Sequence, residues 1–353
     1  MRIGMPLSYS GAFTEVARDV RDYEAAGVDV LFVPEAYSFD AVSILGHLAA
    51  STDRIGLASS ILNTYSRTPA LLGMTAAGLD HVSGGRFTLG IGASGPQVVE
   101  GFHGVAYRAP LGRAREVAGI CRAVWRREVI EHDGVHFQVP LGADRGGTGL
   151  GKPLKLINTP ARARVPMMLA AMGDKAVVLA AELFEAWQPM FFLPEATDEV
   201  FGPSLRAGHA KRDPSLGSLD IVAPSYLAVV GTRDEEEAAL RQVRAHVALY
   251  IGGMGARGKN FYTSLVARFG YGGEAEKVQD LYLAGRREAA AAAVPDALVR
   301  GVALVGPVEV VAARLAAFAV AGATTLNLRP LAADHARRVR DFETVRELTV
   351  LSG

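Results

Sequence analysis

The strongest constraint on the fold is a repeated alternation of two apolar patterns along the chain. A short continuous apolar run is typical of a strand buried on both faces of a parallel sheet, and apolar residues at three-to-four spacing are typical of a helix. The first unit joins a strand at 3–7 to a helix that runs from Phe13 to Ala26. Gly27 then stands where a helix cap is expected, and the run VDVLFVPE at 28–35 predicts the next strand.

The same alternation continues to the end of the sequence. Strands are predicted at 3–7, 28–35, 55–62, 87–91, 166–172, 186–192, 221–230 and 325–328. Helices are predicted at 13–26, 40–50, 69–81, 113–127, 175–183, 235–250 and 308–320. The late string AVAGATTLNL repeats the helix, glycine, strand junction of the early string AAGVDVLFV. Strands that alternate with helices in this way favour an α/β fold of the (β/α)8 TIM-barrel type over an open doubly wound sheet.

We predict a single barrel domain over residues 1–353, with two insertions at approximately 128–160 and 251–300. The first insertion carries Asp133-Gly134 between two alternating segments, which is the signal of a tight hairpin. The following stretch, 140–159, is rich in glycine and has no helical or strand periodicity, as is typical of a functional loop. The second insertion combines glycines, aromatic residues and an alanine run, and we expect it to be helical.

Composition narrows the possible partners. Lysine plus arginine equals aspartate plus glutamate at 37 each, so the chain has no overall field that would hold a nucleic acid or an acidic membrane. The start, MRIGMPLSYSG, lacks the apolar core of a signal peptide, and no apolar run approaches the roughly 20 residues of a membrane-spanning helix. We therefore expect a cytoplasmic protein that acts on a small molecule. Cys121, the single cysteine, lies in a helical apolar pattern and is expected in the core.

The string Gly90-Ile-Gly92-Ala-Ser-Gly95 matches the dinucleotide-binding pattern GxGxxG. That pattern should open a long helix, whereas Pro96 interrupts the residues that follow, and the acidic residue about twenty positions on, Glu116, falls inside a predicted helix. We interpret the segment instead as a barrel strand that enters a loop. Its missing side chains would let a flat ring or a phosphate approach the backbone.

Other catalytic motifs give little support. His132 and His136 have the i,i+4 spacing of a zinc pair on a helix, but the Asp-Gly turn between them predicts solvent-facing residues of a hairpin, and no metal site is expected. The sequence contains no GxSxG elbow, no Walker lysine motif and no HExxH. The remaining possibility for catalysis is chemistry supplied by an organic cofactor.

Polar residues gather where the predicted strands end, which is where barrel enzymes place their active sites. Glu35 ends an apolar strand and could exchange a proton with a ligand at the open end of the barrel. The alternative is that its carboxylate caps a loop or pairs with an arginine. In LAAMGDKA, Gly173 precedes a helix whose first N–H groups would suit a phosphate, with Lys175 adding charge. The alternative there is simple capping by Asp174.

Several blocks of sequence resemble the luciferase-like superfamily, and in particular its F420-dependent oxidoreductase branch. The most specific block is IGLASSILNTYSRTPALLGMTAAGLDHVSGGRFTLGIGASGPQVVEGFHG. The others are AAGVDVLFVPEAY, GTGLGKPLKL, PMMLAAMGDKA and EAWQPMFF. Together they extend the resemblance over nearly the whole chain.

The resemblance implies that coenzyme F420, or alternatively FMN, binds at the carboxyl-terminal mouth of the barrel. It further implies a non-proline cis peptide at Ser60-Ile61, a phosphate-binding turn at Ala171 to Gly173, and a loop beside the cofactor tail at Gly92 to Gly95. The implied cofactor residues are Ser60, Ile61, Asn63, Gly92, Ala93, Ser94, Gly95, Ala171, Met172, Gly173 and Lys175.

The sequence also departs from parts of that family. Its sugar-phosphate and alcohol dehydrogenases carry histidine after the acidic residue, where this chain has Ala36 after Glu35. The glutamate that the sugar-phosphate branch has near Gly95 is absent, which argues against a sugar-phosphate substrate. The resemblance also implies a homodimer.

We therefore predict hydride transfer between F420 and a moderately apolar carbonyl or unsaturated small molecule, with Glu35 managing the proton. Aromatic residues expected near the mouth, Tyr37, Phe39, Tyr65 and Phe102, favour such a substrate. The alternatives are an FMN-dependent monooxygenase and a noncatalytic barrel that serves as a partner subunit.

Overall fold

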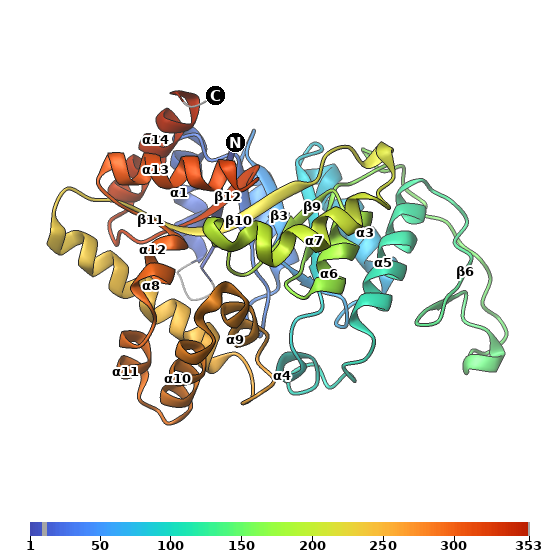
Figure 1. Ribbon diagram of the computed structural model, residues 1–353. Coiled ribbons are helices and arrows are strands. Elements are labelled where there is room, and N and C mark those ends of the chain that lie inside the picture. Colours follow the sequence, from blue (N-terminus) through green and yellow to red (C-terminus); the bar gives the residue numbers. More distant parts are fainter. Residues whose placement is uncertain (9–12, 352–353) are drawn as a thin grey trace.

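The computed structural model describes residues 1–8 and 13–351 and shows a ring of parallel strands surrounded by helices (Figure 1). The pairings run β1–β2–β3–β5–β8–β9–β10–β12 and return to β1, which closes a barrel. These strands are β1 (Arg2–Pro6), β2 (Val30–Val33), β3 (Gly56–Ser59), β5 (Phe87–Gly92), β8 (Met167–Ala170), β9 (Ala186–Gln188), β10 (Asp220–Val229) and β12 (Thr325–Pro330). The predicted (β/α)8 barrel is confirmed, with each ring strand at a predicted position.

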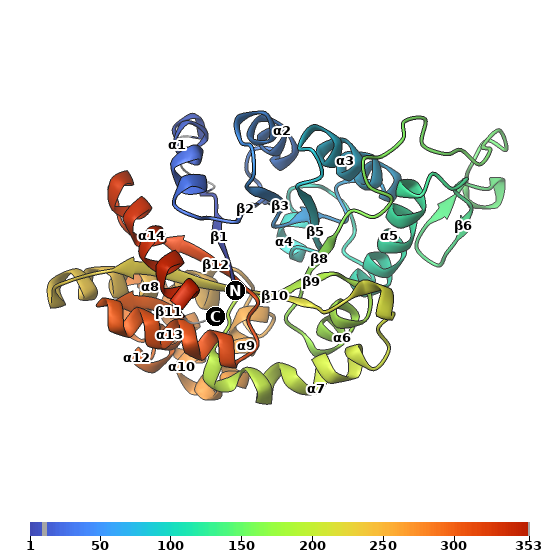
Figure 2. The ribbon, with the colours of Figure 1, turned by 90° about the horizontal axis from the view of Figure 1, so that it is seen from above.

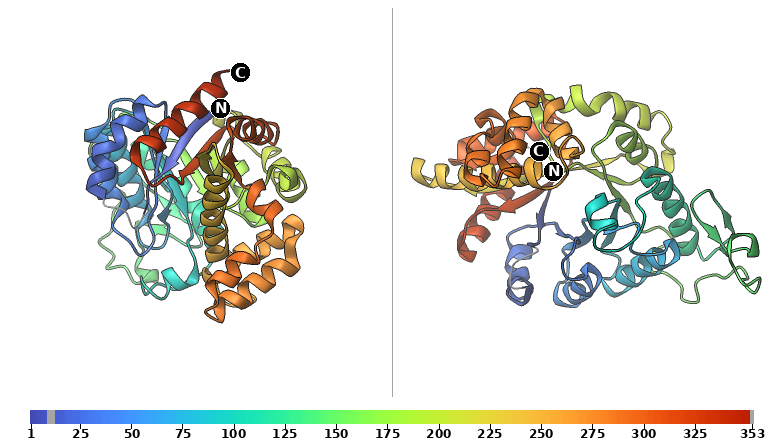
Figure 3. Two further views of the ribbon diagram at one scale, coloured as in Figure 1. Left: turned by 90° about the vertical axis from the view of Figure 1, so that its left-hand side faces the viewer. Right: turned by 90° about the horizontal axis from the view of Figure 1, so that it is seen from below.

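Helices lie outside the strands and connect them (Figures 2 and 3). They are α1 (Phe13–Ala25), α2 (Ala41–Ser51), α3 (Pro69–Val82), α5 (Pro110–Trp125), α6 (Asp174–Leu183), α7 (Thr197–His209), α8 (Arg233–Gly253), α13 (Val308–Val320) and α14 (His335–Leu351). Several of them begin at side-chain caps: Asp40 accepts from Ser43 N, Thr68 from Leu71 N and Thr232 from Glu235 N. Such caps satisfy N–H groups that have no partner within the helix.

Side chains of the strands alternate between two apolar layers. Val30, Phe32 and Met168 belong to a small cluster inside the barrel and are 7% exposed or less. Leu31 and Leu57, which point the other way, join the larger core between strands and helices. Both faces of the strands are therefore buried, which is why they read as continuous apolar runs. Cys121 lies in this core with no exposed surface, as expected, and burial raises the pKa of its thiol to about 12.

The first insertion forms a hairpin of β6 (His132–Asp133) and β7 (Gln138–Val139) at the edge of the molecule (Figure 1). The hairpin is confirmed, but the predicted turn is wrong, because Asp133 pairs with Gln138 and leaves a loop at 134–137. Glu116 of α5 accepts from the backbone N–H groups of His136 and Phe137, which holds this wider loop open. The chain then continues to 166 without regular structure apart from a short 3-10 helix at Ala143–Arg145.

The second insertion is helical, as predicted. It contains α9 (Phe261–Val266), α10 (Gly272–Leu283), α11 (Arg287–Ala292) and α12 (Asp296–Gly301), with a π-helical turn at Ala267–Tyr271 before α10. A strand that the sequence did not predict, β11 (Ala303–Gly306), follows and pairs with the second half of β10. Its four residues run almost directly into α13, so they carry too little pattern to be separated from the helix.

Two long helices were also not predicted, α7 and α14. Pro203 lies inside α7, and a Gly-Pro pair normally argues against a helix. Packing overrides this preference, because Gly208 lies so close to α6 that an added Cβ would stand 2.5 Å from that of Ala181. In α14, Phe342 and Val345 are both fully buried, but the many charged residues around them in the sequence obscure the helical apolar pattern.

The carboxyl ends of the ring strands meet at one end of the barrel, which we call the mouth. The short helix α4 (Pro96–Val99) and α9 lie at this end, at the bottom of Figure 1 and opposite the start of β1. Within residues 1–8 and 13–351, no helix has the length and apolar character needed to cross a bilayer.

Candidate active site

The third predicted strand is broken at the mouth. It divides into β3 and the short β4 (Leu62–Asn63), and the peptide bond between Ser60 and Ile61 is cis. The expected cis peptide is therefore confirmed. At this break Ser60 Oγ donates to Gln188 Oε1 across the mouth at 3.0 Å, so the ends of β3 and β9 are joined by a direct hydrogen bond.

The glycines of β5 allow this close packing. A Cβ on Gly90 would lie 1.8 Å from the carbonyl oxygen of Ser59, so only glycine fits there. A Cβ on Gly92 would lie 3.0 Å from side-chain atoms of Ile61. Beyond the strand, Ser94 has a left-handed backbone with φ of 56°, which is uncommon for a residue other than glycine. The helix that follows, α4, has four residues, so the GxGxxG match opens no Rossmann helix.

Two buried polar atoms beside the break have no partner among the described residues. They are Asn63 Nδ2 and Thr64 Oγ1, in side chains that are 3% and 0% exposed. Asn63 Oδ1, by contrast, accepts from Tyr65 N at 2.8 Å, and Thr64 N donates to the carbonyl of Gly92. Because buried polar atoms normally have hydrogen-bond partners, these two mark a place where a polar ligand can bind.

The junction after β8 presents a helix amino terminus at the mouth. Gly173 is the N-cap of α6 and provides no side-chain cap, so the first N–H groups of the helix are available to an anion. The alternative of capping by Asp174 is wrong, because Asp174 instead pairs with Arg268 of the second insertion at 2.5 Å. Arg268 also donates to the carbonyl of Met172, and Lys175 is exposed in the same turn. The turn thus combines free N–H groups with two cationic side chains.

Glu35 lies at the mouth after β2 and both of its carboxylate oxygens are engaged. Arg67 Nη1 donates to Oε1 at 2.6 Å and Arg67 Nη2 donates to Oε2 at 2.8 Å. Ala41 N, at the start of α2, also donates to Oε2. Arg67 donates further to Asp40, the cap of α2. These contacts match the alternative prediction, in which the Glu35 carboxylate pairs with an arginine. Glu35 can take part in proton transfer only if its ion pair with Arg67 opens.

Aromatic side chains surround the mouth. Tyr107 stacks on Tyr65 with ring centroids 5.3 Å apart, and its hydroxyl donates to the carbonyl of Ser94 at 3.5 Å. Burial raises the pKa of Tyr107 to about 12. From the opposite side, Phe191, Tyr250 and Tyr262 form a second aromatic group with centroid distances of 4.9–6.5 Å. Three of the four predicted mouth aromatics, Tyr37, Phe39 and Phe102, are largely exposed, and Tyr65 is buried.

The two hairpin histidines do not form a metal site. His132 Nε2 lies 3.1 Å from Glu116 Oε2, and His136 donates its backbone N–H to the same carboxylate. Both residues are half-buried, which corrects the expectation that they face solvent. Across the described part of the chain, no group of three or more histidine, cysteine, aspartate or glutamate side chains is arranged to hold a metal.

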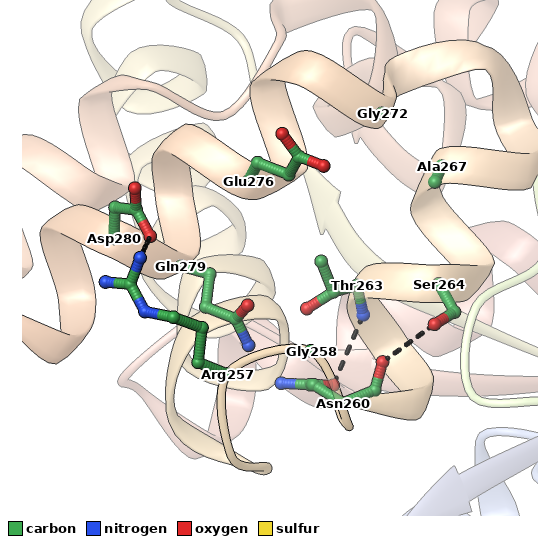
Figure 4. Close-up of a pocket in the computed structure, with 10 residues that line it drawn as sticks. All are labelled: Arg257, Gly258, Asn260, Thr263, Ser264, Ala267, Gly272, Glu276, Gln279 and Asp280. Atoms are coloured by element: carbon green, nitrogen blue, oxygen red, sulfur yellow. Dashed lines mark hydrogen bonds and ion pairs between the residues drawn. The ribbon is translucent and has the colours of Figure 1, made fainter.

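A separate hollow of about 360 Å³ lies on the second insertion, between α9 and α10 (Figure 4). Asn260 forms its base, accepting from the N–H groups of Tyr262 and Thr263 and donating to the carbonyls of Tyr250 and Ile251. The rim carries the exposed ion pair of Arg257 and Asp280. The hydrogen bonds of Asn260 at the base of this hollow therefore attach α9, which carries Tyr262, to the end of α8.

Several residues at the mouth of the barrel were not predicted from the sequence. Gln188 and Arg268 come from segments far along the chain, and no local pattern relates them to Ser60 or Gly173. The block EAWQPMFF contains Gln188 and was the one available signal for it. Arg67 follows Ser66 in the block that carries the resemblance, but nothing in its spacing indicates Glu35 as its partner.

Comparison with known proteins decides the family. The model of the luciferase-like monooxygenase family matches residues 1–325. This chain belongs to that family. A Mycobacterium tuberculosis protein provisionally named a coenzyme F420-dependent oxidoreductase is 39% identical over 345 residues, which are 97% of this chain and 98% of the relative. The 5,10-methylenetetrahydromethanopterin reductase of Archaeoglobus fulgidus is 30% identical over 70% of each chain.

Solved structures agree on the fold of the family. The F420-dependent tetrahydromethanopterin reductase of Methanopyrus kandleri superposes with a TM-score of 0.80 at 19% identity, covering 99% of both chains. An F420-dependent secondary alcohol dehydrogenase gives a TM-score of 0.73 at 17% identity, covering 98% of both chains. The predicted family resemblance is confirmed, and the chain is a luciferase-like oxidoreductase.

Proposed function

We propose that residues 1–353 form one catalytic domain that uses coenzyme F420 to transfer hydride to or from a moderately apolar carbonyl or unsaturated small molecule. The observation that carries the cofactor assignment is the 39% identity, over nearly the full length of both chains, to the F420-named relative. The archaeal reductase, named for a reduced pterin, supports hydride transfer rather than oxygen chemistry.

Features of the mouth fit the polar, flat ring and the phosphate of F420. The unpartnered Asn63 Nδ2 and Thr64 Oγ1 offer hydrogen bonds to a heterocycle beside the cis bond of Ser60-Ile61. Gly92 leaves room for the side chain of Ile61, and Ala93 to Gly95, which follow it, are half-buried and carry only small side chains. These residues would hold the ring and tail of the cofactor, which supplies the hydride carrier when it is bound.

The turn Ala171-Met172-Gly173 would hold the phosphate. The free N–H groups at the start of α6 and the positive end of the helix dipole favour an anion there. Lys175 and Arg268 add charge, and the hydrogen bond from Arg268 to Met172 O fixes the shape of the turn. Glu35 would exchange the substrate proton after release from Arg67, and in the closed pair it orders α2 at the edge of the mouth.

Titration of the purified protein with F420 and, separately, with FMN tests the proposal through quenching of cofactor fluorescence. Saturable binding of F420 in preference to FMN is the expected result. Preference for FMN would instead assign monooxygenase chemistry, as in the structural neighbour solved with FMN. Binding of neither cofactor would favour a noncatalytic partner subunit.

We also propose that the protein is cytoplasmic, as its apolar pattern favours, and that it is a homodimer, an expectation that the family resemblance supplies. Leu71 and Met74 of α3 support a protein contact at this face, because they are apolar and 45% and 53% exposed. Light scattering of Leu71→Asp beside the unmodified protein tests this, with a shift from dimer to monomer as the expected result.

A further inference from the structure

Arg329 occupies a distinct position at the mouth. It stands near the carboxyl end of β12, where Leu326 and Leu328 point outward into the core beneath the helices. Since side chains alternate along a strand, Arg329 shares the inner face with Asn327. β12 lies opposite β5 in the ring of eight strands, so Arg329 faces the proposed cofactor side from across the mouth.

A half-buried histidine holds this arginine in place. Arg329 Nη1 lies 2.8 Å from His246 Nε2, and Nδ1 of the same ring lies 2.6 Å from the hydroxyl of Tyr226. A guanidinium only donates, so Nε2 accepts and the ring proton lies on Nδ1, from which it donates to Tyr226. Burial first, and the charge of Arg329 second, lower the pKa of His246 to about 3. The imidazole is therefore neutral at physiological pH.

Among the described side chains, the partner of Arg329 is neutral and no carboxylate balances the charge of the guanidinium. No described side chain that carries a carboxylate forms an ion pair with Arg329, whereas Arg67 and Arg268 at the same mouth are both paired with carboxylates. Arg329 is exposed, so its remaining donors are accessible. An exposed, immobilised guanidinium of this kind is suited to bind an oxyanion through charge-assisted hydrogen bonds.

The aromatic residues beside His246 and Arg329 indicate the chemistry of the rest of the ligand. Tyr250 lies 4.9 Å from His246 between ring centroids, and it continues through Tyr262 and Phe191 as an aromatic wall. Arg329 lowers the pKa of Tyr250, although burial, the larger effect, raises it overall, so the hydroxyl stays protonated. Tyr250 and Tyr262, both half-buried, thus offer aromatic surface beside one fixed cation, and the buried Phe191 lies behind them.

We propose that Arg329, positioned by His246, is the recognition group for a carboxylate on the substrate, and that Tyr250 and Tyr262, backed by Phe191, pack against the apolar body of the substrate. The substrate class is then an apolar or aromatic carboxylic acid that carries the carbonyl or double bond to be reduced. This inference rests on the proposed function, because the cofactor occupies the opposite side of the mouth.

Calorimetric titration with benzoate, with the neutral benzamide as matched ligand, tests the proposal in the presence and absence of F420. The unmodified protein should bind benzoate more tightly than benzamide by about tenfold or more, the usual size of one charge-assisted hydrogen-bond pair. Arg329→Gln should abolish that preference, and Arg329→Lys should retain part of it. His246→Phe should weaken benzoate binding while binding of F420 stays unchanged.

Three results would overturn the assignment. They are equal affinity of Arg329→Gln and unmodified protein for benzoate, no preference for benzoate over benzamide, and loss of F420 binding in Arg329→Gln with benzoate unaffected. The last result would place a carboxylate of the cofactor tail on Arg329. If the unmodified protein fails to bind F420 yet prefers benzoate through Arg329, the proposed function fails while the carboxylate site stands.

Discussion

At the scale of single residues, the geometry of the mouth depends on a few positions where a small change in the side chain would displace neighbouring residues. Gly92 is such a position, because an added Cβ would meet Ile61 at 3.0 Å. Glu35 is another, since its carboxylate holds three donors from α2 and Arg67 in place. Each leads to a prediction with a clear control.

We expect Gly92→Val to weaken F420 binding by about tenfold or more, since its branched methyl groups would push Ile61 and the cis bond out of position. Fluorescence titration measures the effect. Gly119→Val on α5 is the control, because Gly119 is exposed and nothing lies within 4 Å of a Cβ there. Equal F420 affinity of the two variants would contradict the placement of the ring beside Gly92.

We expect Glu35→Gln to lower the free energy of unfolding by about 3 kcal/mol, since it leaves the largely buried Arg67 with one carboxylate in place of two. Urea denaturation measures the change. Asp198→Asn is the control: it breaks an ion pair whose side chains are 89% and 65% exposed, and should cost less than about 1 kcal/mol. A loss of turnover in Glu35→Gln without a loss of stability would instead identify a catalytic carboxylate.

At the scale of elements, the aromatic wall depends on how α9 is attached. Asn260 caps α9 through its Oδ1, which accepts from Thr263 N (Figure 4). Its Nδ2 holds the end of α8 by donating to the carbonyls of Tyr250 and Ile251. Its side chain is 3% exposed, so all four hydrogen bonds are shielded from water. One residue therefore fixes the angle between the two helices that carry Tyr250 and Tyr262.

We expect Asn260→Ala to destabilise the protein by about 2 kcal/mol and to increase amide hydrogen exchange selectively in residues 250–266, because a cap and two bonds to α8 are lost. Mass spectrometry of exchanged peptides locates the change. Ser264→Ala serves for comparison, as it removes a single half-buried hydrogen bond from the Ser264 hydroxyl to the carbonyl of Asn260. Uniform exchange across both variants would show that packing alone holds α9.

At the scale of the whole molecule, α14 completes the ring of helices that encloses the barrel. It buries Phe342, Val345 and the carboxylate of Asp341, which is 2% exposed. Burial raises the pKa of Asp341 to about 6, despite an opposing ion pair with Arg337 at 3.4 Å. Folding thus favours the protonated carboxyl, and the stability it contributes is lost as pH rises from about 4 to about 6.

We expect Asp341→Asn, which resembles the protonated form, to be more stable than the unmodified protein at pH 8 by about 2 kcal/mol. The difference should shrink toward zero as pH falls to about 4, where the unmodified residue is itself protonated. Thermal unfolding across this range measures it. Glu343→Gln, at an exposed position of the same helix, should show no such pH dependence; a constant offset in both variants would refute the interpretation.

The sequence by itself determined the barrel. Alternating apolar runs and helical periods depend on local spacing, and they placed all eight ring strands. Local pattern was insufficient where packing decided the outcome, as in α7, whose Gly208 meets Ala181, and in the hairpin loop that Glu116 holds open. The resemblance, rather than periodicity, supplied the cis bond at Ser60-Ile61.

Only the tertiary structure decided which side chains meet at the mouth. Glu35 with Arg67, Ser60 with Gln188, and Arg329 with His246 are separated along the chain by 32, 128 and 83 residues. No periodicity links such pairs, because closing the barrel brings together the ends of strands that are distant in sequence. The order of residues along each strand thus determines where polar side chains stand, while barrel closure determined their partners and left Arg329 without a carboxylate among the described side chains.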